Sequence, residues 1–282
     1  MADIVVSGAS SLVGSYLLPK LLAQGHQLDV ISRNQGESRE NLCWHQLPLE
    51  KADLSGLAVP DGFTYIHLAP LWLLPPILPE LARRKVSRII AFSSTSVLTK
   101  QNSPHPAEQA VVAKLQSAEQ ALVNSGLNNW TIIRPTLIYA AGRDKNVAMI
   151  AGLIRRVGIF PLIGSGKGLR QPVHAEDLAS AVVATLLDSQ THNKIYALSG
   201  GETLSYRAMI ERVFQALNLP IRIVSIPSPL FAIALRLARC LPRFRHLHMQ
   251  MAYRMNQDLC FDHSEARQDF GYAPRKFDRP LD

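Results

Sequence analysis

A glycine-containing turn near the start of the chain holds the residues best suited to bind an anion. An apolar run over residues 4–6 leads to Gly8, and Gly14 follows six residues later, just before a helix-like pattern of leucines. A strand, a tight turn and a helix N-terminus in this order direct backbone N–H groups and the positive helix end at one point, where a pyrophosphate can sit. We expect anion contacts from Gly8, Ser10, Ser11, Leu12, Val13 and Gly14. The segment also fits an ordinary turn in which Ser10 or Ser11 caps the helix.

The residues that follow the second expected strand, Gln27–Ile31, are polar and basic. They are Ser32, Arg33 and Asn34. In a dinucleotide site, an acidic residue here accepts hydrogen bonds from the ribose 2′-hydroxyl of NAD, whereas a cation accommodates the 2′-phosphate of NADP. The Arg33 guanidinium suits a phosphate and can stack on adenine, so we expect NADP(H) in preference to NAD(H). The competing interpretation is a solvated loop arginine.

Composition and charge narrow the classes of partner. The net charge of +8 favours anionic ligands, but the cations are scattered and aromatic residues are few, so we expect no nucleic-acid binding. The three cysteines, Cys43, Cys240 and Cys260, are far apart and form no C-x-x-C pair, which predicts neither a metal site nor a disulfide framework. The chain begins with a strand pattern and not a secretion signal, and we expect it in the cytoplasm.

Strands and helices alternate through the first half of the chain. Continuous apolar strands separated by helices indicate an α/β fold with a doubly wound parallel sheet. After the first two strands, the expected elements are strands at 42–47, 63–68, 87–92 and 130–134 and helices at 78–84 and 107–124.

Beyond Pro135 several glycines interrupt the chain, and the regular alternation of strands and helices ends. Helices are expected at 176–187 and 206–217, strands at 195–198 and 221–225, and two or three further helices after them. We predict a Rossmann domain over 1–140 and a smaller, mostly helical substrate lobe over 141–282, and leave open that segments of the lobe return to the sheet.

Five motifs, taken in order, resemble the short-chain dehydrogenase/reductase superfamily, in its extended or atypical branch of nucleotide-sugar epimerases and dehydratases. They occupy residues 8–14, 66–70, 91–97, 134–139 and 168–179. The tail segments 254–259 and 270–275 look like uncharacterised bacterial members, which are similar to the NADPH-binding accessory subunit of respiratory complex I. The resemblance implies a cofactor across the strand edge and a substrate under the C-terminal lobe. It also implies cofactor contacts from Ala69, Pro70, Ser93, Pro135, Thr136 and Ile138.

One residue of the superfamily's usual chemistry is missing. That chemistry uses a tyrosine and a lysine four residues apart on the long helix, and a serine after the fifth strand. By this resemblance Lys114 contacts the ribose and Ser94 orients the substrate oxygen, with Ser93 and Thr95 as alternatives, but Ala110 stands in the tyrosine position. Lys114 also fits a solvated helix lysine near Glu108 and Glu119.

Four other residues have the right chemistry to replace the missing acid. We expect Tyr139 to be structural, His174 packed, His67 a satisfied core histidine and His105 exposed in its loop. The standard mechanism therefore lacks its proton donor.

On the substrate side, the resemblance implies that Arg170 meets a diphosphate and that Asn146 faces the same cavity. Arg170 could instead pair with Glu176 or Asp177. The loop at 69–74 is apolar, so either a hydrophobic ligand binds here or Trp72 acts as a plug.

Three hypotheses follow. The first is an NADP(H)-dependent oxidoreductase or epimerase/dehydratase with altered proton delivery, acting on a small phosphorylated or apolar molecule. The second is a non-catalytic NADPH-holding scaffold, sensor or assembly factor, whose protein partner the sequence does not identify. The third is membrane-surface contact through residues 230–248. We expect weak or no membrane binding, because a basic helix packed on the lobe explains this stretch as well.

Overall fold

The computed structural model describes residues 2–34, 36–51, 54, 56–101, 103–140, 142–238, 254–278 and 280–281. The chain forms two compact units. The first comprises Met1–Pro135, Ala175–Leu198 and Asp262–Ala273, and the second comprises Thr136–His174, Ser199–Phe261 and Pro274–Asp282. Two segments from the second half of the chain therefore belong to the first unit.

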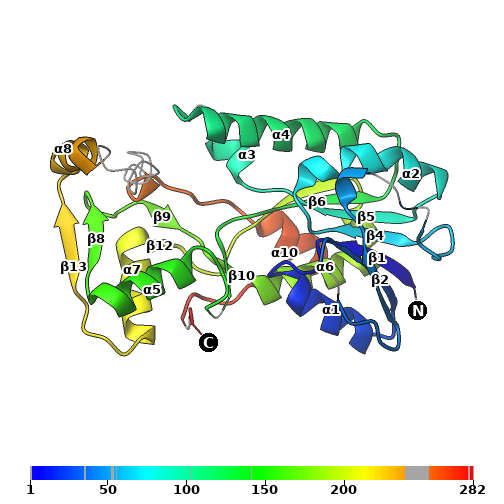
Figure 1. The fold of residues 1–282 in the computed structure, drawn as a ribbon, viewed down its shortest axis with the longest axis horizontal. Coiled ribbons are helices and arrows are strands. Elements are labelled where there is room, and N and C mark those ends of the chain that lie inside the picture. Colours follow the sequence, from blue (N-terminus) through cyan, green and yellow to red (C-terminus); the bar gives the residue numbers. More distant parts are fainter. Residues whose placement is uncertain are drawn as a thin grey trace. The chain divides into compact units, whose positions relative to one another are not determined.

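A seven-stranded parallel sheet forms the centre of the first unit (Figure 1). The strand order β3-β2-β1-β4-β5-β6-β11 follows the doubly wound pattern, in which the direction of winding reverses between β1 and β4. The strands are β1 (Asp3–Ser7), β2 (Gln27–Ser32), β3 (Leu42–Gln46), β4 (Thr64–His67), β5 (Arg88–Phe92), β6 (Trp130–Pro135) and β11 (Lys194–Leu198). The predicted α/β fold is confirmed, and the expected strands agree with these to within one or two residues.

Helices cover both faces of this sheet. In Figure 1 α1 (Gly14–Ala23), α6 (Ala175–Leu187) and α10 (Ser264–Phe270) lie on one face, and α2 (Leu78–Arg83), α3 (Ser96–Thr99) and α4 (Pro106–Val123) lie on the other. The central strands are buried on both sides, which explains their continuous apolar sequences. The core under α2 and α4 joins buried side chains such as Val5, Tyr65, Ile89, Leu115 and Ile132.

The last strand and the last helix of the first unit come from late in the chain. Strand β11 pairs in parallel with β6, with Tyr196 opposite Ile133. Helix α10 is held to β11 because the Asp269 carboxylate accepts hydrogen bonds from Lys194 Nζ and Tyr196 Oη, each at 2.5 Å. These contacts explain why residues beyond 140 complete the sheet.

The second unit holds helices, short strands and a core of its own. The helices are α5 (Val147–Val157), α7 (Tyr206–Ala216) and α8 (Ser228–Ala238). Two-stranded sheets pair β7 (Ile138–Tyr139) with β10 (Val173–His174), β9 (Leu169–Arg170) with β12 (Leu204–Ser205), and β8 (Phe160–Ile163) with β13 (Ile223–Ile226). Buried residues from α5, β8 and α7, among them Ile150, Leu162 and Phe214, form its core.

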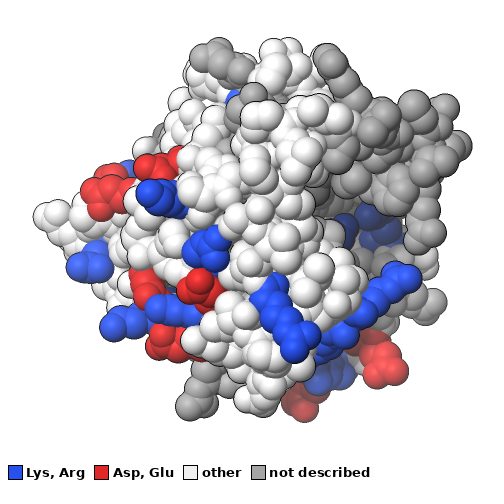
Figure 2. All heavy atoms as spheres, turned by 90° about the vertical axis from the view of Figure 1, so that its left-hand side faces the viewer, with Lys and Arg blue, Asp and Glu red and all other residues white. Residues whose placement is uncertain are grey.

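The charge and hydropathy of the described residues indicate which kinds of partner, such as nucleic acid or a membrane, the protein could bind. Lys and Arg lie among Asp and Glu on the face that Figure 2 shows, and the described cations there form no single-sign patch. Within the described ranges no helix has the length and apolar character needed to cross a bilayer. Most of the basic stretch at 230–248 lies outside the described residues, because these stop at 238 and resume at 254.

Candidate functional site

Two glycines shape the turn between β1 and α1, where the sheet changes its direction of winding. Gly8 has a φ of +73°, and a Cβ there would lie 2.4 Å from the backbone nitrogen of Ala69, just beyond β4. A Cβ at Gly14 would lie 2.1 Å from the carbonyl oxygen of Ala9. Both distances are far below van der Waals contact, so both positions require glycine for backbone packing.

The turn presents unused backbone donors. The amide of Gly14 donates to Ser11 Oγ at 3.2 Å, but the N-cap residue of α1 is Val13 and no side chain caps the helix, so the interpretation of Ser10 or Ser11 as the cap is wrong. The amides of Ser10, Leu12 and Val13 have no acceptor among the described residues. They lie at the N-terminus of α1, where the helix dipole favours an anion. The turn therefore has N–H groups available for a phosphate at the start of α1.

The loop after β2 is held by its backbone while its arginine extends into solvent. Gln46 Nε2 donates to the Arg33 carbonyl oxygen at 3.1 Å, and Trp44 Nε1 donates to that of Asn34 at 2.9 Å. The buried Ser32 accepts from the Asn34 amide through its Oγ. The Arg33 guanidinium is exposed and has no hydrogen-bond or ion-pair partner among the described residues. Its charge is thus available to a ligand.

Lys114 lies on the exposed side of α4 with its ammonium 5.9 Å from the centre of the Trp72 ring. This cation–π contact joins α4 to the 3₁₀ helix η2 (Leu71–Leu73), which follows β4 and Pro70. Ala110 is also exposed, one helical turn before Lys114. Glu119 forms an ion pair with Arg134, and Glu108 forms one with Lys100. Neither of these two acids pairs with Lys114. Among the described residues Lys114 thus contacts an aromatic ring and makes no ion pair with a carboxylate.

The serines after β5 make different contacts. Ser93 Oγ donates at 2.5 Å to Glu119, which is buried and ion-paired to Arg134. Ser94 Oγ accepts a hydrogen bond from the Ser96 amide and donates one to Ser96 Oγ. Both contacts are within the loop, and Ser94 is half-buried. Sequence reasoning missed the buried Glu119–Arg134 pair, for which only the opposite charges of the two residues gave a signal. Of the two, Ser94 has the environment expected of a substrate-orienting serine.

His67 is buried at the end of β4 and both its ring nitrogens have partners. Nδ1 lies 2.8 Å from Ser7 Oγ and Nε2 lies 3.2 Å from the Pro70 carbonyl oxygen. Burial lowers the pKa of His67 to about 4, against the backbone hydrogen bond that raises it. The expectation of a satisfied core histidine is confirmed.

This buried imidazole predicts an acid-sensitive stability. Between pH 6.5 and about pH 4 the unfolded chain protonates His67 and the folded protein does not, so stability falls as pH falls through this window. We expect unfolding in urea to show a loss of about 2–3 kcal/mol from this group between pH 7.5 and pH 4.5. His67→Gln removes the titration and should reduce the loss by that amount. An unchanged pH dependence in the variant contradicts this assignment.

The remaining candidate acids were expected to be packed or exposed. In the second unit Tyr139 and His174 are buried, with ring centres 5.1 Å apart, and Tyr139 also packs edge-on against Phe277 at 4.8 Å. Both agree with the packed roles expected of them. His105 is half-buried at the start of α4, so the expectation of an exposed loop histidine is wrong. It is the N-cap residue of α4 and precedes Pro106, the first residue of that helix.

The residues expected near nicotinamide and substrate fall in both units. Pro135 ends β6, whereas Thr136 Oγ1 donates to the Gln171 carbonyl oxygen at 2.5 Å and Ile138 is half-buried in β7. Asn146 is exposed at the start of α5. The expectation that these residues contact a ligand stays a prediction.

Arg170 is buried, and burial lowers its pKa. Its guanidinium donates to the carbonyl oxygens of Leu169 and Gln257 at 2.7 and 2.6 Å, and to that of Arg254, and it stacks on Tyr206 at 5.4 Å. The acceptors are carbonyl oxygens within its own unit, so most of its donors already serve the fold. A diphosphate contact from Arg170 stays a prediction.

The geometry of the first unit defines its fold class. A parallel sheet of this order, with a glycine turn at the point where its winding reverses, is a Rossmann-type fold. The same fold occurs in UDP-glucuronic acid 4-epimerase from Bacillus cereus in complex with NAD, with a TM-score of 0.76 and 16% identity over 99% of this chain and 96% of that one. UDP-glucose 4-epimerase from Thermotoga maritima gives 0.72 and 16%, over 99% and 96%.

Part of the chain matches a family model. Residues 76–199 match the model of the NAD dependent epimerase/dehydratase family, which confirms the expected resemblance. Uncharacterized protein y4nG of Sinorhizobium fredii is 27% identical, over 96% of this chain and 74% of that protein. The mitochondrial NADH dehydrogenase (ubiquinone) 1 alpha subcomplex subunit 9 of Arabidopsis thaliana is 30% identical, over 40% of this chain and only 28% of that protein.

Proposed function

We propose that this chain binds NADP(H) at the carboxyl edge of the parallel sheet, in the cytoplasm, as a protein of the epimerase/dehydratase type. The observation that carries the proposal is the turn of residues 8–14, where two obligatory glycines shape the backbone and the amides of Ser10, Leu12 and Val13 have no acceptor among the described residues. These donors and the α1 dipole suit the pyrophosphate of a dinucleotide. Ala69 and Pro70 lie beside this turn because β4 adjoins β1.

The preference for the phosphorylated dinucleotide rests on Arg33. Its backbone is pinned by Gln46, its side chain has no competing partner in the described part of the chain, and Ser32 and Asn34 flank it. A guanidinium in this position makes charge-assisted hydrogen bonds to a 2′-phosphate. NAD(H) lacks that group, and no acidic side chain stands there to bind its 2′-hydroxyl.

Chemistry at the site depends on proton supply. A bound nicotinamide supplies or accepts hydride, while the chain's own residues bind, orient and protonate the substrate. Lys114 suits the nicotinamide ribose and Ser94 suits a substrate oxygen, and Ala110 offers no proton at the place where the superfamily has tyrosine. A catalytic form therefore takes its proton from the substrate, from water or from a group outside this position. The substrate of such a form would be a phosphorylated or apolar small molecule.

The alternative is a protein that holds NADPH without turnover. Two observations favour it. Ala110 is exposed beside Lys114, and three of the four candidate donors, His67, Tyr139 and His174, are buried. A scaffold, sensor or assembly factor needs the residues that bind the cofactor but does not need a proton donor for catalysis. The similarity to the Arabidopsis NADH dehydrogenase subunit, over its short match, agrees with this alternative.

Calorimetric titration with NADPH and NADH tests the proposal. We expect native protein to bind NADPH more tightly, and Arg33→Gln to weaken NADPH binding by about 10- to 100-fold with little effect on NADH, because a charge-assisted hydrogen bond contributes about 1.5–3 kcal/mol. Arg39→Gln, at another exposed arginine between β2 and β3, is the matched control and should leave both affinities unchanged. Equal affinity of native protein for the two dinucleotides contradicts the role of Arg33.

A further inference from the structure

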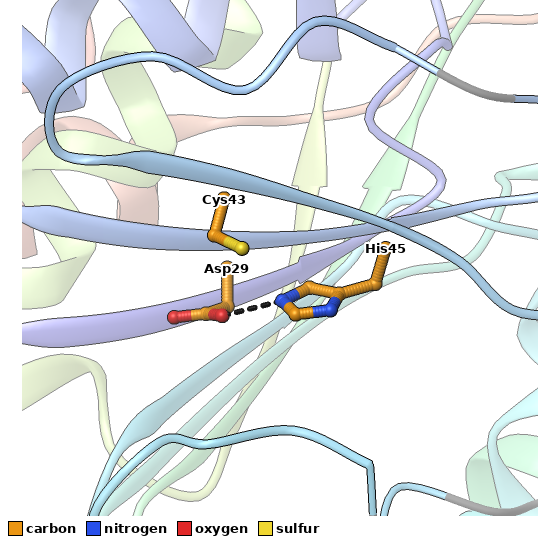
Figure 3. Close-up of side chains that lie close together, drawn as sticks. All are labelled: Asp29, Cys43 and His45. Atoms are coloured by element: carbon orange, nitrogen blue, oxygen red, sulfur yellow. Dashed lines mark hydrogen bonds and ion pairs between the residues drawn. The ribbon is translucent and has the colours of Figure 1, made fainter.

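Three side chains with metal-binding chemistry meet at the edge of the sheet in the first unit. Asp29 lies on β2, and Cys43 and His45 lie on the edge strand β3. Asp29 pairs in register with Cys43, and His45 is two residues further along the same strand. Because side chains alternate along a strand, all three project from the same face (Figure 3).

The three groups are close enough to share one ion. Their ligand atoms all lie within 4.8 Å of one another, and His45 Nε2 is 2.6 Å from Asp29 Oδ1. In a tetrahedral zinc site neighbouring ligand atoms stand about 3.3–3.6 Å apart, given zinc–ligand distances of about 2.0–2.3 Å. Small rotations of exposed or half-buried side chains cover the difference. The proton that now joins His45 to Asp29 occupies the place that the metal would take.

We propose that Asp29, Cys43 and His45 form a surface site for Zn²⁺, with water in the fourth position. Thiolate and imidazole select zinc-type ions over Mg²⁺ and Ca²⁺, and three protein ligands leave one position open. Binding releases the Cys43 thiol proton to solvent, and His45 binds through Nε2 as the neutral imidazole with its N–H on Nδ1. No redox step is involved, and the proposal does not depend on nucleotide binding.

The site departs from the expectation that the dispersed cysteines exclude a metal. Distances along the chain between cysteines do not reveal it, because its third ligand comes from a neighbouring strand and only one cysteine takes part. The local signal is the Cys-x-His spacing on a strand, which places both residues on one face. An acid in the paired strand completes the set, and that pairing is visible only in the fold.

Titration of tag-free protein with Zn²⁺, and with Co²⁺ as a spectroscopic probe, tests the site. We expect one equivalent of Zn²⁺ by calorimetry and a thiolate-to-cobalt charge-transfer band in the near ultraviolet. Cys43→Ser should abolish the band, and His45→Ala or Asp29→Asn should weaken Zn²⁺ binding by at least about tenfold, since even an outer-shell partner contributes about 10- to 100-fold. Mg²⁺ should not displace the bound ion.

Cys260→Ser is the matched control, because Cys260 is also a free, exposed cysteine but lies in the second unit. It should leave the cobalt band and the Zn²⁺ affinity unchanged. The proposal is overturned if native protein shows no thiolate–cobalt band, if the band persists in Cys43→Ser, or if the Zn²⁺ affinity of the three ligand variants equals that of native protein.

Discussion

Replacement of Gly14 by alanine should remove most of the affinity for the dinucleotide. The added Cβ would lie 2.1 Å from the Ala9 carbonyl oxygen, a rigid backbone group that can give way only if the turn moves. Movement of the turn misdirects the amides of Ser10, Leu12 and Val13. Since each hydrogen bond to a charged group contributes about 1.5–3 kcal/mol, loss of one corresponds to about 10- to 100-fold weaker NADPH binding in calorimetry.

The same substitution should lower stability, so its control must separate folding from binding. We expect overpacking to cost about 1–3 kcal/mol in urea unfolding. Gly152→Ala is the matched control, because Gly152 is a helical glycine on α5 with open space around it. That variant should keep full NADPH affinity and gain up to about 1 kcal/mol of stability. A folded Gly14→Ala protein that binds NADPH as tightly as native protein contradicts the assignment of the phosphate site.

Introduction of tyrosine at position 110 should produce the second large effect. Residues 110 and 114 are four apart on α4 and both are exposed, so a phenol at 110 would share a helix face with the Lys114 ammonium. That cation lowers the pKa of a nearby phenol and favours proton exchange with a substrate oxygen. General acid catalysis contributes about 10²–10⁴-fold, and we expect Ala110→Tyr to raise NADPH oxidation with carbonyl substrates by this order.

Two variants separate acid catalysis from side-chain bulk. Ala110→Phe adds nearly the same volume without a hydroxyl and should stay at the native rate. Adding Lys114→Met to Ala110→Tyr should remove the gain. If native protein turns over the same substrates as fast as Ala110→Tyr, the native site obtains its proton elsewhere and the non-catalytic alternative fails. If Ala110→Phe matches Ala110→Tyr, the gain comes from side-chain bulk and the role assigned to the phenol is contradicted.

The order of elements was predictable because the central strands of the first unit are buried on both faces. Runs such as Arg88–Phe92 and Trp130–Pro135 are continuously apolar or nearly so, and the glycine turn follows β1 directly. The identity of the cofactor-facing turn could thus be inferred from local sequence. The obligatory nature of Gly14 could not, because it depends on the distance to Ala9, which only the folded turn defines.

Contacts between distant segments were not predictable. Arg88 is buried and donates to Thr131 Oγ1 and Thr191 Oγ1 at 2.6 Å, partners 43 and 103 residues away along the chain. Burial lowers its pKa to about 10. The stacking of Lys114 over Trp72 and the cluster of Asp29 with His45 likewise join separate elements. Pairing of strands and packing of helices decide such contacts, and a single sequence does not specify them.

The central claim is that the turn of residues 8–14 and Lys114 hold one and the same dinucleotide. A crystal structure of the protein with NADPH tests it most directly. We expect a pyrophosphate on the amides of Ser10, Leu12 and Val13, the 2′-phosphate at Arg33 and the nicotinamide ribose within hydrogen-bond distance of Lys114 Nζ. A nucleotide bound elsewhere, or a Lys114 side chain directed into solvent beside a bound cofactor, would contradict it.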